Sequence, residues 1–117
     1  MAPIAVYTTV GSIDDARRIA AALVERRLVA CAQISEIESF YRWEGAVQNE
    51  REFRLLLKTT DERYAAVEAA VRELHPYELP AIHAVPFAHV HAPYGAWIEA
   101  GSTGADAGPG GLTADSE

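Results

Sequence analysis

The chain has 117 residues, of which 50% are hydrophobic and 23% charged, a composition typical of one globular domain. The formal net charge is −7 and the basic residues are scattered, which argues against a nucleic-acid-binding protein, because such proteins present a basic surface. No apolar run is long enough to span a bilayer, no signal peptide is apparent, and the single cysteine, Cys31, cannot form an internal disulfide. We therefore expect a cytoplasmic protein without a membrane partner.

The first half of the chain predicts a strand, a helix and a long strand. Residues 4–10 are rich in β-branched side chains, as strands are. Ser12 is a candidate helix N-cap, and apolar residues then recur at helical spacing at Ala16, Ile19, Ala20, Leu23 and Val24. Residues 28–45 return to β character. In their second half one face is expected to carry Ile37, Ser39, Tyr41 and Trp43, and a hairpin turn is expected at residues 44–47.

The second half predicts a strand, a helix, a strand and a short helix. Apolar residues alternate at Phe53, Leu55 and Leu57, and Thr59 with Glu62 forms a capping-box pattern. The helix that follows is marked by Tyr64, Val67, Val71 and Leu74, and Pro76 ends it. Residues 81–90 predict a fourth strand, which Pro86 restricts to a sheet edge or a bulge. Residues 93–100 predict the last helix.

The order βαββαβ predicts an α+β fold of the ferredoxin-like type, an antiparallel sheet with both helices on one face. The folded domain is expected to cover residues 1–100. Residues 101–117 are rich in glycine and contain no basic residue, so we expect a disordered tail. The second sheet face has no cover within the chain and carries Tyr41 and Trp43, which favours oligomerisation.

Five stretches occur in a characteristic order and spacing: LVERRLVACAQI, SFYRWEG, LLLKTT, HPYELPAI and YGAWI. Together they resemble the CutA family, the divalent-cation tolerance proteins, over about residues 4–99. The resemblance implies a cytoplasmic homotrimer of ferredoxin-like subunits, similar to the trimeric PII signalling proteins. It also implies a role in tolerance of copper and other divalent metals, and it brings no established catalytic reaction.

The stretch HPYELPAI offers His75 and Glu78 as candidate metal ligands, because imidazole with carboxylate suits Cu(II) and Zn(II). The alternative is that both side chains anchor the turn between helix and strand by hydrogen bonds. The resemblance implies two further copper ligands, a second histidine and a cysteine at the end of the first strand. In this chain Leu74 stands where the second histidine would be, and Thr8 and Thr9 stand near the end of the first strand, where the cysteine would be.

Two weaker metal candidates lie elsewhere. Cys31 is a soft ligand, but a lone cysteine in a strand is more often packed in the core. His89 and His91 can share an ion if their segment is extended, and otherwise they are surface histidines. These candidates would bind Cu(II) or another divalent cation, and none of them makes a cofactor obligatory.

Four further residues are candidates for a ligand cleft between subunits: Trp43, Lys58, Tyr77 and Trp97. Lys58 precedes a predicted helix N-terminus, which can hold an anion; alternatively, the aromatic residues form interface packing. No catalytic motif is found, so we expect no enzyme. The sequence therefore predicts a trimeric divalent-cation (copper) binding protein in metal homeostasis. The alternative is a PII-like module that binds a small anion in intersubunit clefts.

Overall fold

The computed structural model describes residues 2–104, and its central element is strand β1 (Pro3–Val10). On one side β1 pairs with β3 (Ala46–Thr60), and on the other side with β4 (Ile82–Pro86). Strand β2 (Cys31–Trp43) pairs with the outer side of β3, so the strand order is β2-β3-β1-β4 and every pairing is antiparallel. The predicted ferredoxin-like α+β fold is confirmed, with β4 at a sheet edge as Pro86 requires.

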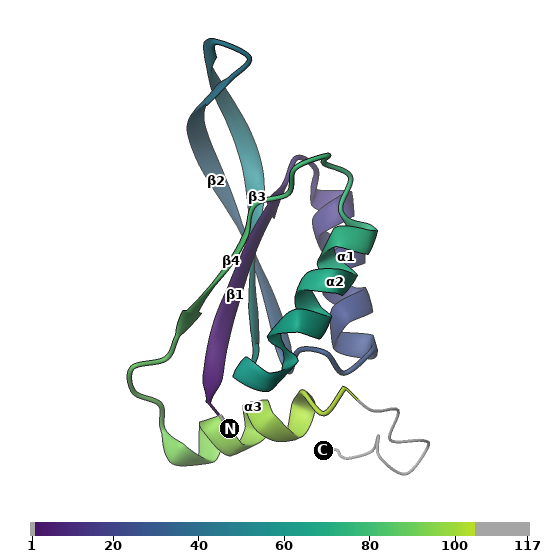
Figure 1. Cartoon of the computed structure of the whole chain (residues 1–117), viewed down its shortest axis with the longest axis vertical. Helices are drawn as coiled ribbons and strands as arrows, with labels where there is room; N and C mark the ends of the chain where they lie inside the picture. The colour runs from purple at the N-terminus through teal and green to yellow at the C-terminus, as the bar shows by residue number, and fades with distance from the viewer. Residues whose placement is uncertain (1, 105–117) are drawn as a thin grey trace.

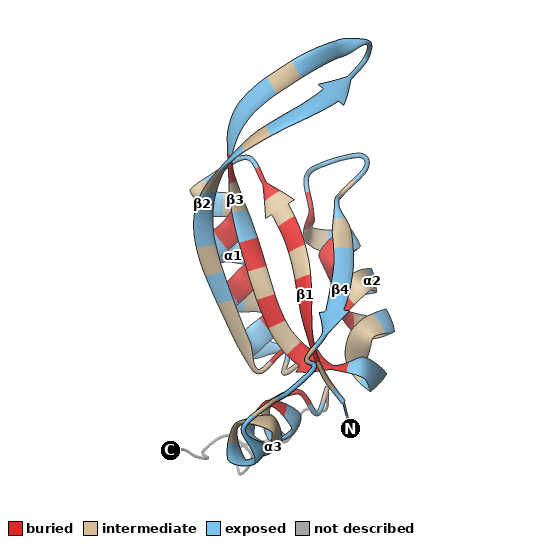
Figure 2. Ribbon diagram, turned by 90° about the vertical axis from the view of Figure 1, so that its left-hand side faces the viewer, coloured by how far each residue is buried: buried red, intermediate tan, exposed pale blue. Residues whose placement is uncertain are grey.

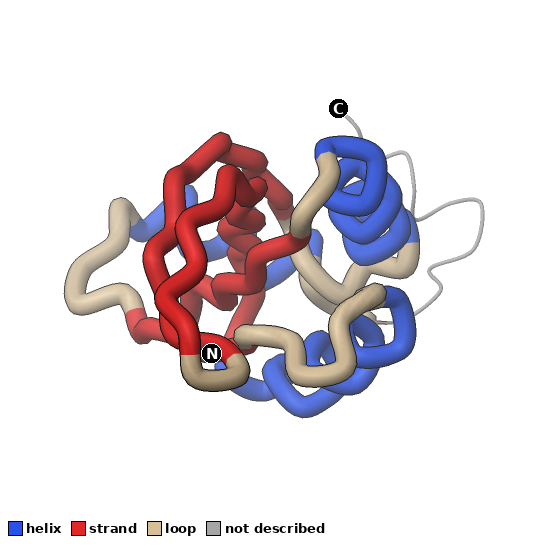
Figure 3. Tube along the Cα trace, turned by 90° about the horizontal axis from the view of Figure 1, so that it is seen from above, coloured by secondary structure: helices blue, strands red, loops and turns tan. Residues whose placement is uncertain are grey.

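The helices α1 (Ile13–Glu25) and α2 (Tyr64–Leu74) lie on the same side of the strands (Figures 1 and 3). Helix α1 begins where predicted, because the Ser12 hydroxyl accepts a hydrogen bond from the Asp15 backbone N–H at 3.1 Å. Helix α2 ends at Leu74, and His75 is already extended, with ψ of 135°. Pro76 explains this, since the residue before a proline avoids the helical region.

The core fills the space between this sheet face and the two helices (Figure 2). Alternate residues of the central strands point into it, and both helices close it with one apolar face each. Its fully buried large side chains include Val6, Val10, Leu55, Leu57, Ile19, Leu23, Val67 and Val71. The prediction that Val24 belongs to the buried face of α1 is wrong. This residue is 42% exposed, because it lies at the edge of the apolar face of the helix.

Three predicted details differ from the structure. The Thr59 hydroxyl does not cap a helix; it donates to the Leu28 carbonyl at 2.8 Å, and a 3-10 turn, η1 (Asp61–Arg63), precedes α2. The fourth strand ends at Pro86 rather than at residue 90, since proline has no N–H to continue the ladder. Helix α3 (Ala92–Gly101) then crosses below the sheet (Figure 1).

The hairpin between β2 and β3 turns at Glu44 and Gly45, which have φ values of 51° and 82°. Positive φ at both positions is the requirement of the tight two-residue hairpin turn, and Trp43 pairs directly with Ala46. Beyond the end of β1, which stops at the pairing of Val10 with Phe53, residues 37–52 continue as a two-stranded projection. We call residues 37–52 the arm (Figure 1).

The end of the folded part lies later than predicted. Gly101 is the last residue of α3, and the Ser102 side chain is buried, with its hydroxyl donating to the Ile98 carbonyl at 2.7 Å. The Gly104 N–H donates to the Arg27 carbonyl at 2.8 Å. Residues 101–104 therefore belong to the fold, and the rest of the predicted tail, residues 105–117, lies outside the described residues.

Ending the chain after Ala100 is therefore expected to destabilise the protein relative to a chain that ends after Gly104. The shorter chain loses the Ser102 and Gly104 hydrogen bonds, each worth about 0.5–1.5 kcal/mol. Thermal unfolding of the two truncated proteins at equal concentration measures the difference. Equal melting temperatures would mean that residues 101–104 contribute nothing to the stability of the fold.

Candidate functional site

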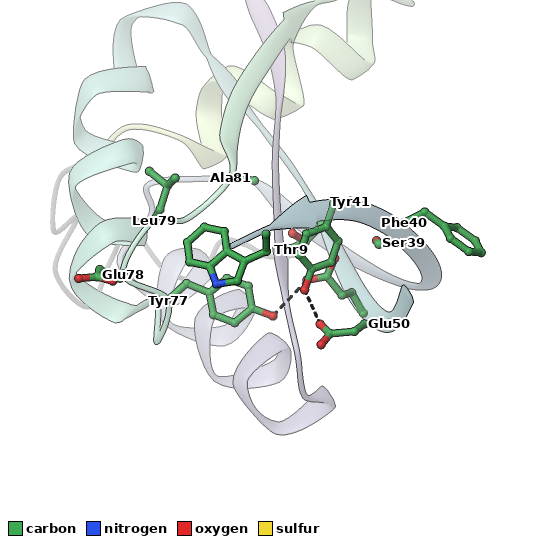
Figure 4. Close-up of a pocket in the computed structure, with 11 residues that line it drawn as sticks. Thr9, Ser39, Phe40, Tyr41, Glu50, Tyr77, Glu78, Leu79 and Ala81 are labelled. Atoms are coloured by element: carbon green, nitrogen blue, oxygen red, sulfur yellow. Dashed lines mark hydrogen bonds between the residues drawn. The ribbon is translucent and has the colours of Figure 1, made fainter. Parts of the chain in front are cut away.

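A pocket of about 570 Å³ lies at the base of the arm, where the loop after α2 faces the open side of the sheet. The arm contributes residues from both of its strands, and the stretch HPYELPAI contributes the opposite wall (Figure 4). The lining residues are Thr9, Ser39, Phe40, Tyr41, Trp43, Glu50, Glu52, Tyr77, Glu78, Leu79 and Ala81. The pocket therefore joins residues that are far apart in the sequence.

Two tyrosine–glutamate pairs organise the pocket. The Tyr41 hydroxyl donates to Glu50 Oε1 at 2.6 Å, and the Tyr77 hydroxyl donates to Glu52 Oε2 at 3.0 Å (Figure 4). The bond to the Glu50 carboxylate raises the pKa of Tyr41 to about 12. Burial, followed by the bond to Glu52, raises the pKa of Tyr77 to about 12. Both phenols therefore keep their protons at neutral pH and act as hydrogen-bond donors.

The charge of the pocket is negative. Glu52 is only 7% exposed, although carboxylates are rarely buried without a positive partner. Within residues 2–104 neither Glu50 nor Glu52 takes part in an ion pair, and no lining side chain is basic. In residues 2–104 the side-chain hydrogen-bond partner of each carboxylate is a phenol hydroxyl group, and Glu50, unlike Glu52, is exposed to solvent.

His75 does not face the pocket. It is 8% exposed, so its ring is not presented at the surface as a metal ligand would be. Its Nε2 lies 2.7 Å from the Thr9 carbonyl, and its Nδ1 accepts the Tyr77 N–H at 3.1 Å, which assigns a neutral ring with the proton on Nε2. Burial lowers the pKa of His75, which favours the same neutral form. Both ring nitrogens are occupied, so this arrangement has no lone pair for a metal ion.

Glu78 is not brought together with His75. It is exposed at the rim, and Figure 4 shows its carboxylate pointing away from Tyr77 and Tyr41. The imidazole–carboxylate pair predicted for copper therefore does not fit this geometry. In residues 2–104 no group of three or more His, Cys, Asp or Glu side chains is placed to hold a metal ion. The alternative interpretation, in which His75 anchors the turn, agrees with its two hydrogen bonds.

The weaker metal candidates are dispersed. Cys31 is half-buried in β2, opposite Lys58 of β3. His89 and His91 are exposed between β4 and α3. The strand predicted over residues 81–90 ends at Pro86, so neither histidine lies in a strand. The structure brings none of these three to the pocket.

The predicted cleft residues fall into two places. Trp43 and Tyr77 line the pocket. Lys58 instead donates to the Tyr94 hydroxyl of α3 at 2.9 Å, and this bond raises the pKa of Lys58. Trp97 stacks on Tyr94, with ring centroids 5.7 Å apart. Along β3, Lys58 and Glu52 are about 20 Å apart at ~3.3 Å per residue, so one subunit cannot place all four residues in one cleft.

Sequence reasoning missed Tyr41 and both carboxylates as site residues. The position of the hairpin turn could have indicated Tyr41 and Glu50. If the turn is assigned to Glu44 and Gly45, the strand register follows, and Ser39 lies opposite Glu50. Tyr41 is then diagonal to Glu50 on the same face. The contact between Glu52 and Tyr77 has no such local signal, because it is long-range.

Comparison with known proteins agrees with this fold. Residues 4–101 match the family described as CutA1 divalent ion tolerance protein. The chain belongs to the CutA1 family. A curated family member, the divalent-cation tolerance protein CutA of Thermus thermophilus, is 44% identical over 94 residues, which cover 80% of this chain and 91% of that protein.

Solved structures of CutA1 family members have the same architecture. CutA from Synechococcus elongatus superposes with a TM-score of 0.84 at 32% identity, covering 87% of this chain and 91% of that one. A protein described as the periplasmic divalent cation tolerance protein CutA from Archaeoglobus fulgidus superposes with a TM-score of 0.80 at 36% identity, covering 82% and 94%. Among residues 2–104 of this CutA1 protein, no helix has the length and apolar character of a membrane span.

The substitution His75→Ala tests the anchoring role. It leaves the Thr9 carbonyl and the Tyr77 N–H without their buried partner, so we expect the free energy of unfolding to fall by about 1–3 kcal/mol. Denaturant unfolding at fixed concentration measures this. His89→Ala, which removes an exposed histidine, is the matched control and should change stability by less than about 0.5 kcal/mol. Equal effects of the two substitutions would contradict the anchoring role.

The same histidine predicts acid sensitivity. Its pKa is lowered in the folded protein, so its contribution to stability is complete above the unfolded pKa of about 6.5 and is lost as the pH falls from there through the lowered folded value. Unfolding free energies measured between pH 7.5 and pH 5 should therefore fall more in the unaltered protein than in His75→Ala. If the unfolding free energies of the two proteins changed with pH in parallel, the predicted contribution of His75 to acid sensitivity would be contradicted.

Proposed function

We propose that this CutA1 protein binds divalent cations as a homotrimer and acts in metal tolerance. Its relatives carry the name divalent-cation tolerance protein, and the present chain gathers uncompensated carboxylates in one pocket. The single observation that carries the proposal is the buried charge of Glu52, which has a phenol and no cation beside it within residues 2–104. Binding rather than catalysis is the role that such a site supports.

The donor atoms decide which cations are favoured. The pocket offers the carboxylate oxygens of Glu50 and Glu52, with Glu78 at its rim. Oxygen ligands suit Mg²⁺, Ca²⁺ and Mn²⁺, whereas copper prefers imidazole or thiolate. Copper binding, the first expectation from the sequence, therefore depends on Cys31, His89 or His91 joined by a ligand from another subunit. Two carboxylates are too few for a tight site, so a neighbouring subunit is expected to complete the coordination.

Trimer formation is supported by the uncovered side of the sheet. On this face β1 presents Tyr7 and β3 presents Leu56, which are cross-strand partners. Val85 of the edge strand is 46% exposed, and Trp43 on the arm is 47% exposed. Large apolar side chains left exposed on one face of a sheet are expected to be covered by another copy of the chain.

The alternative of a PII-like module that binds a small anion receives no support from this pocket, because its lining contains carboxylates and no basic side chain among the described residues. An anion site would have to form around Lys58, where the ammonium already bonds to Tyr94. A cytoplasmic location is likewise part of the proposal.

Metal binding is tested by calorimetric titration with Mn²⁺ and with Cu²⁺ at pH 7.5. Glu52→Gln should weaken Mn²⁺ binding at least about tenfold, because it removes a charged ligand and keeps the shape. Glu44→Gln, which removes the same charge from the tip of the same arm, is the matched control and should bind normally. The proposed site would be contradicted if neither ion gave a heat of binding, or if Glu52→Gln and Glu44→Gln bound Mn²⁺ with equal affinity.

The trimer is tested by light scattering, which should give about three times the chain mass of 12.7 kDa. Leu56→Glu places a charge in the middle of the uncovered face and should yield monomers, because burying an unpaired carboxylate costs several kcal/mol. Val24→Glu, on an exposed position of α1, should remain trimeric. A monomeric unaltered protein at micromolar concentration would refute the proposed assembly.

A further inference from the structure

The pocket at the base of the arm belongs to the face that the proposed homotrimer covers. Within residues 2–104 the Glu52 carboxylate has a phenol hydroxyl group and no cation beside it, and it is 7% exposed. Assembly removes the solvent that remains in the pocket, and a buried carboxylate without a positive partner is strongly destabilising. The neighbouring copies of the chain are therefore the expected source of that partner.

The uncovered side of β3 carries charges of both signs. Alternate residues of a strand point to the same face, so the even-numbered positions of β3 share the face on which Leu56 lies. Acidic side chains occupy this face on the arm, and basic side chains occupy it on the body of the sheet. In chain order these charged residues are Glu50, Glu52, Arg54 and Lys58.

Of the two basic residues, Arg54 is the one available to a neighbour. The Lys58 ammonium group is engaged, because it donates to the Tyr94 hydroxyl at 2.9 Å. Arg54 is exposed and takes part in no ion pair within residues 2–104. Its guanidinium group lies over the ring of Tyr7 on the body of the sheet, 5.9 Å from the ring centroid. The guanidinium group of Arg54 can therefore pair with a carboxylate of another copy.

We propose that Arg54 of each copy enters the pocket of the next copy and pairs with Glu52 there. Three such pairs form a closed ring of alternating charges around the three-fold axis. This inference rests on the homotrimer proposed above and does not depend on metal binding. It identifies the contact that closes the assembly, and it makes the pocket complete only where two copies meet.

The spacing of the two residues suits such a ring. Glu52 and Arg54 are two positions apart on one strand, about 7 Å at ~3.3 Å per residue. The pocket of one copy and the arginine that this copy offers therefore lie at nearly the same level of the sheet. Rotation about a three-fold axis keeps that level, so each copy can give one arginine and accept one, which is the requirement of a closed cyclic interface.

The chemistry of the pocket suits a guanidinium group. Tyr41 donates to Oε1 of Glu50 and Tyr77 donates to Oε2 of Glu52, which leaves the other oxygen of each carboxylate as an acceptor. A guanidinium group presents several N–H donors in one plane and stacks on aromatic rings. The rings of Tyr41, Trp43 and Tyr77 line the pocket beside the carboxylates. The same side chain can therefore satisfy both the charge and the aromatic walls.

The experiment compares two charge reversals, alone and mixed. Arg54→Glu brings two carboxylates together at each contact, and Glu52→Arg brings two guanidinium groups together. For each variant alone, the concentration at which half of the trimers dissociate should rise at least about thirtyfold. In an equimolar mixture every contact between unlike chains is again a carboxylate–guanidinium pair, so a mixed trimer has two repaired contacts. Light scattering over a dilution series should show more trimer in the mixture than in either variant.

Mixing separates contacts between copies from contacts within a chain, because a defect inside one chain is not repaired by a second chain. Arg17→Glu and Glu25→Arg make the same charge changes at exposed positions of α1 and should leave the trimer intact. Circular dichroism checks that each variant is folded. If Glu52→Arg does not fold, Glu50→Arg takes its place in the mixture, because it brings a positive charge into the same pocket at an exposed position.

The ring and the metal proposal can fail separately. The ring is overturned if Arg54→Glu leaves the trimer unchanged, or if the mixture contains no more trimer than the two variants alone. A monomeric unaltered protein would refute the homotrimer and the ring with it. Absence of Mn²⁺ binding would refute the metal proposal only, since the ring contains no metal ion. If both hold, a divalent cation that binds Glu52 has to displace the guanidinium group of the neighbouring copy.

Discussion

The two-residue turn at Glu44 and Gly45 is the constraint on which the rest of the site depends. Because both residues take positive φ, the chain reverses without an extra residue, and the register of β2 against β3 is fixed along its whole length. A slip by one residue would carry Tyr41 and Trp43 to the other face of the arm. It would also separate Tyr41 from Glu50, and the pocket would lose one of its two tyrosine–glutamate pairs.

The stretch HPYELPAI supplies the other half of the pocket by a different physical route. Pro76 ends the helix, and the buried ring of His75 ties the chain to the end of β1 through the Thr9 carbonyl. The same ring accepts a hydrogen bond from the Tyr77 backbone N–H, which fixes the position of the Tyr77 backbone. From there the Tyr77 hydroxyl reaches Glu52 on the arm. The histidine is thus a positioning residue, and the tyrosine after the proline is the residue that meets the pocket.

The fold was largely predictable because its signals are local. The Ser12 cap, the alternation of Phe53, Leu55 and Leu57, and the proline after α2 each follow from two or three neighbouring residues. The errors occurred where a tertiary contact replaced a local one. Thr59 bonds to the Leu28 carbonyl instead of capping a helix, and Ser102 is buried despite its polar, glycine-rich surroundings.

The site was less predictable than the fold, for a related reason. A histidine beside a carboxylate in sequence has the composition of a metal site, but burial and the two backbone partners of His75 are properties of the folded chain. Glu52 gave no signal of its own, since its partner lies far away in the chain. The resemblance to CutA proteins directed attention to a loop that lines the pocket, and only the geometry separates its anchoring residue from its pocket residues.

The arm has a further consequence for how binding and motion are related. Residues 37–52 extend past the end of β1, so their strands are held by one another and by the Tyr77–Glu52 hydrogen bond to the loop, while the helices lie beside the body of the sheet (Figure 1). Such a segment opens at a lower free energy than the core strands, and its amide hydrogens should exchange sooner. Since the arm carries both carboxylates, any cation that bridges arm and loop slows this local opening. Occupancy of the pocket and order of the arm are therefore linked equilibria.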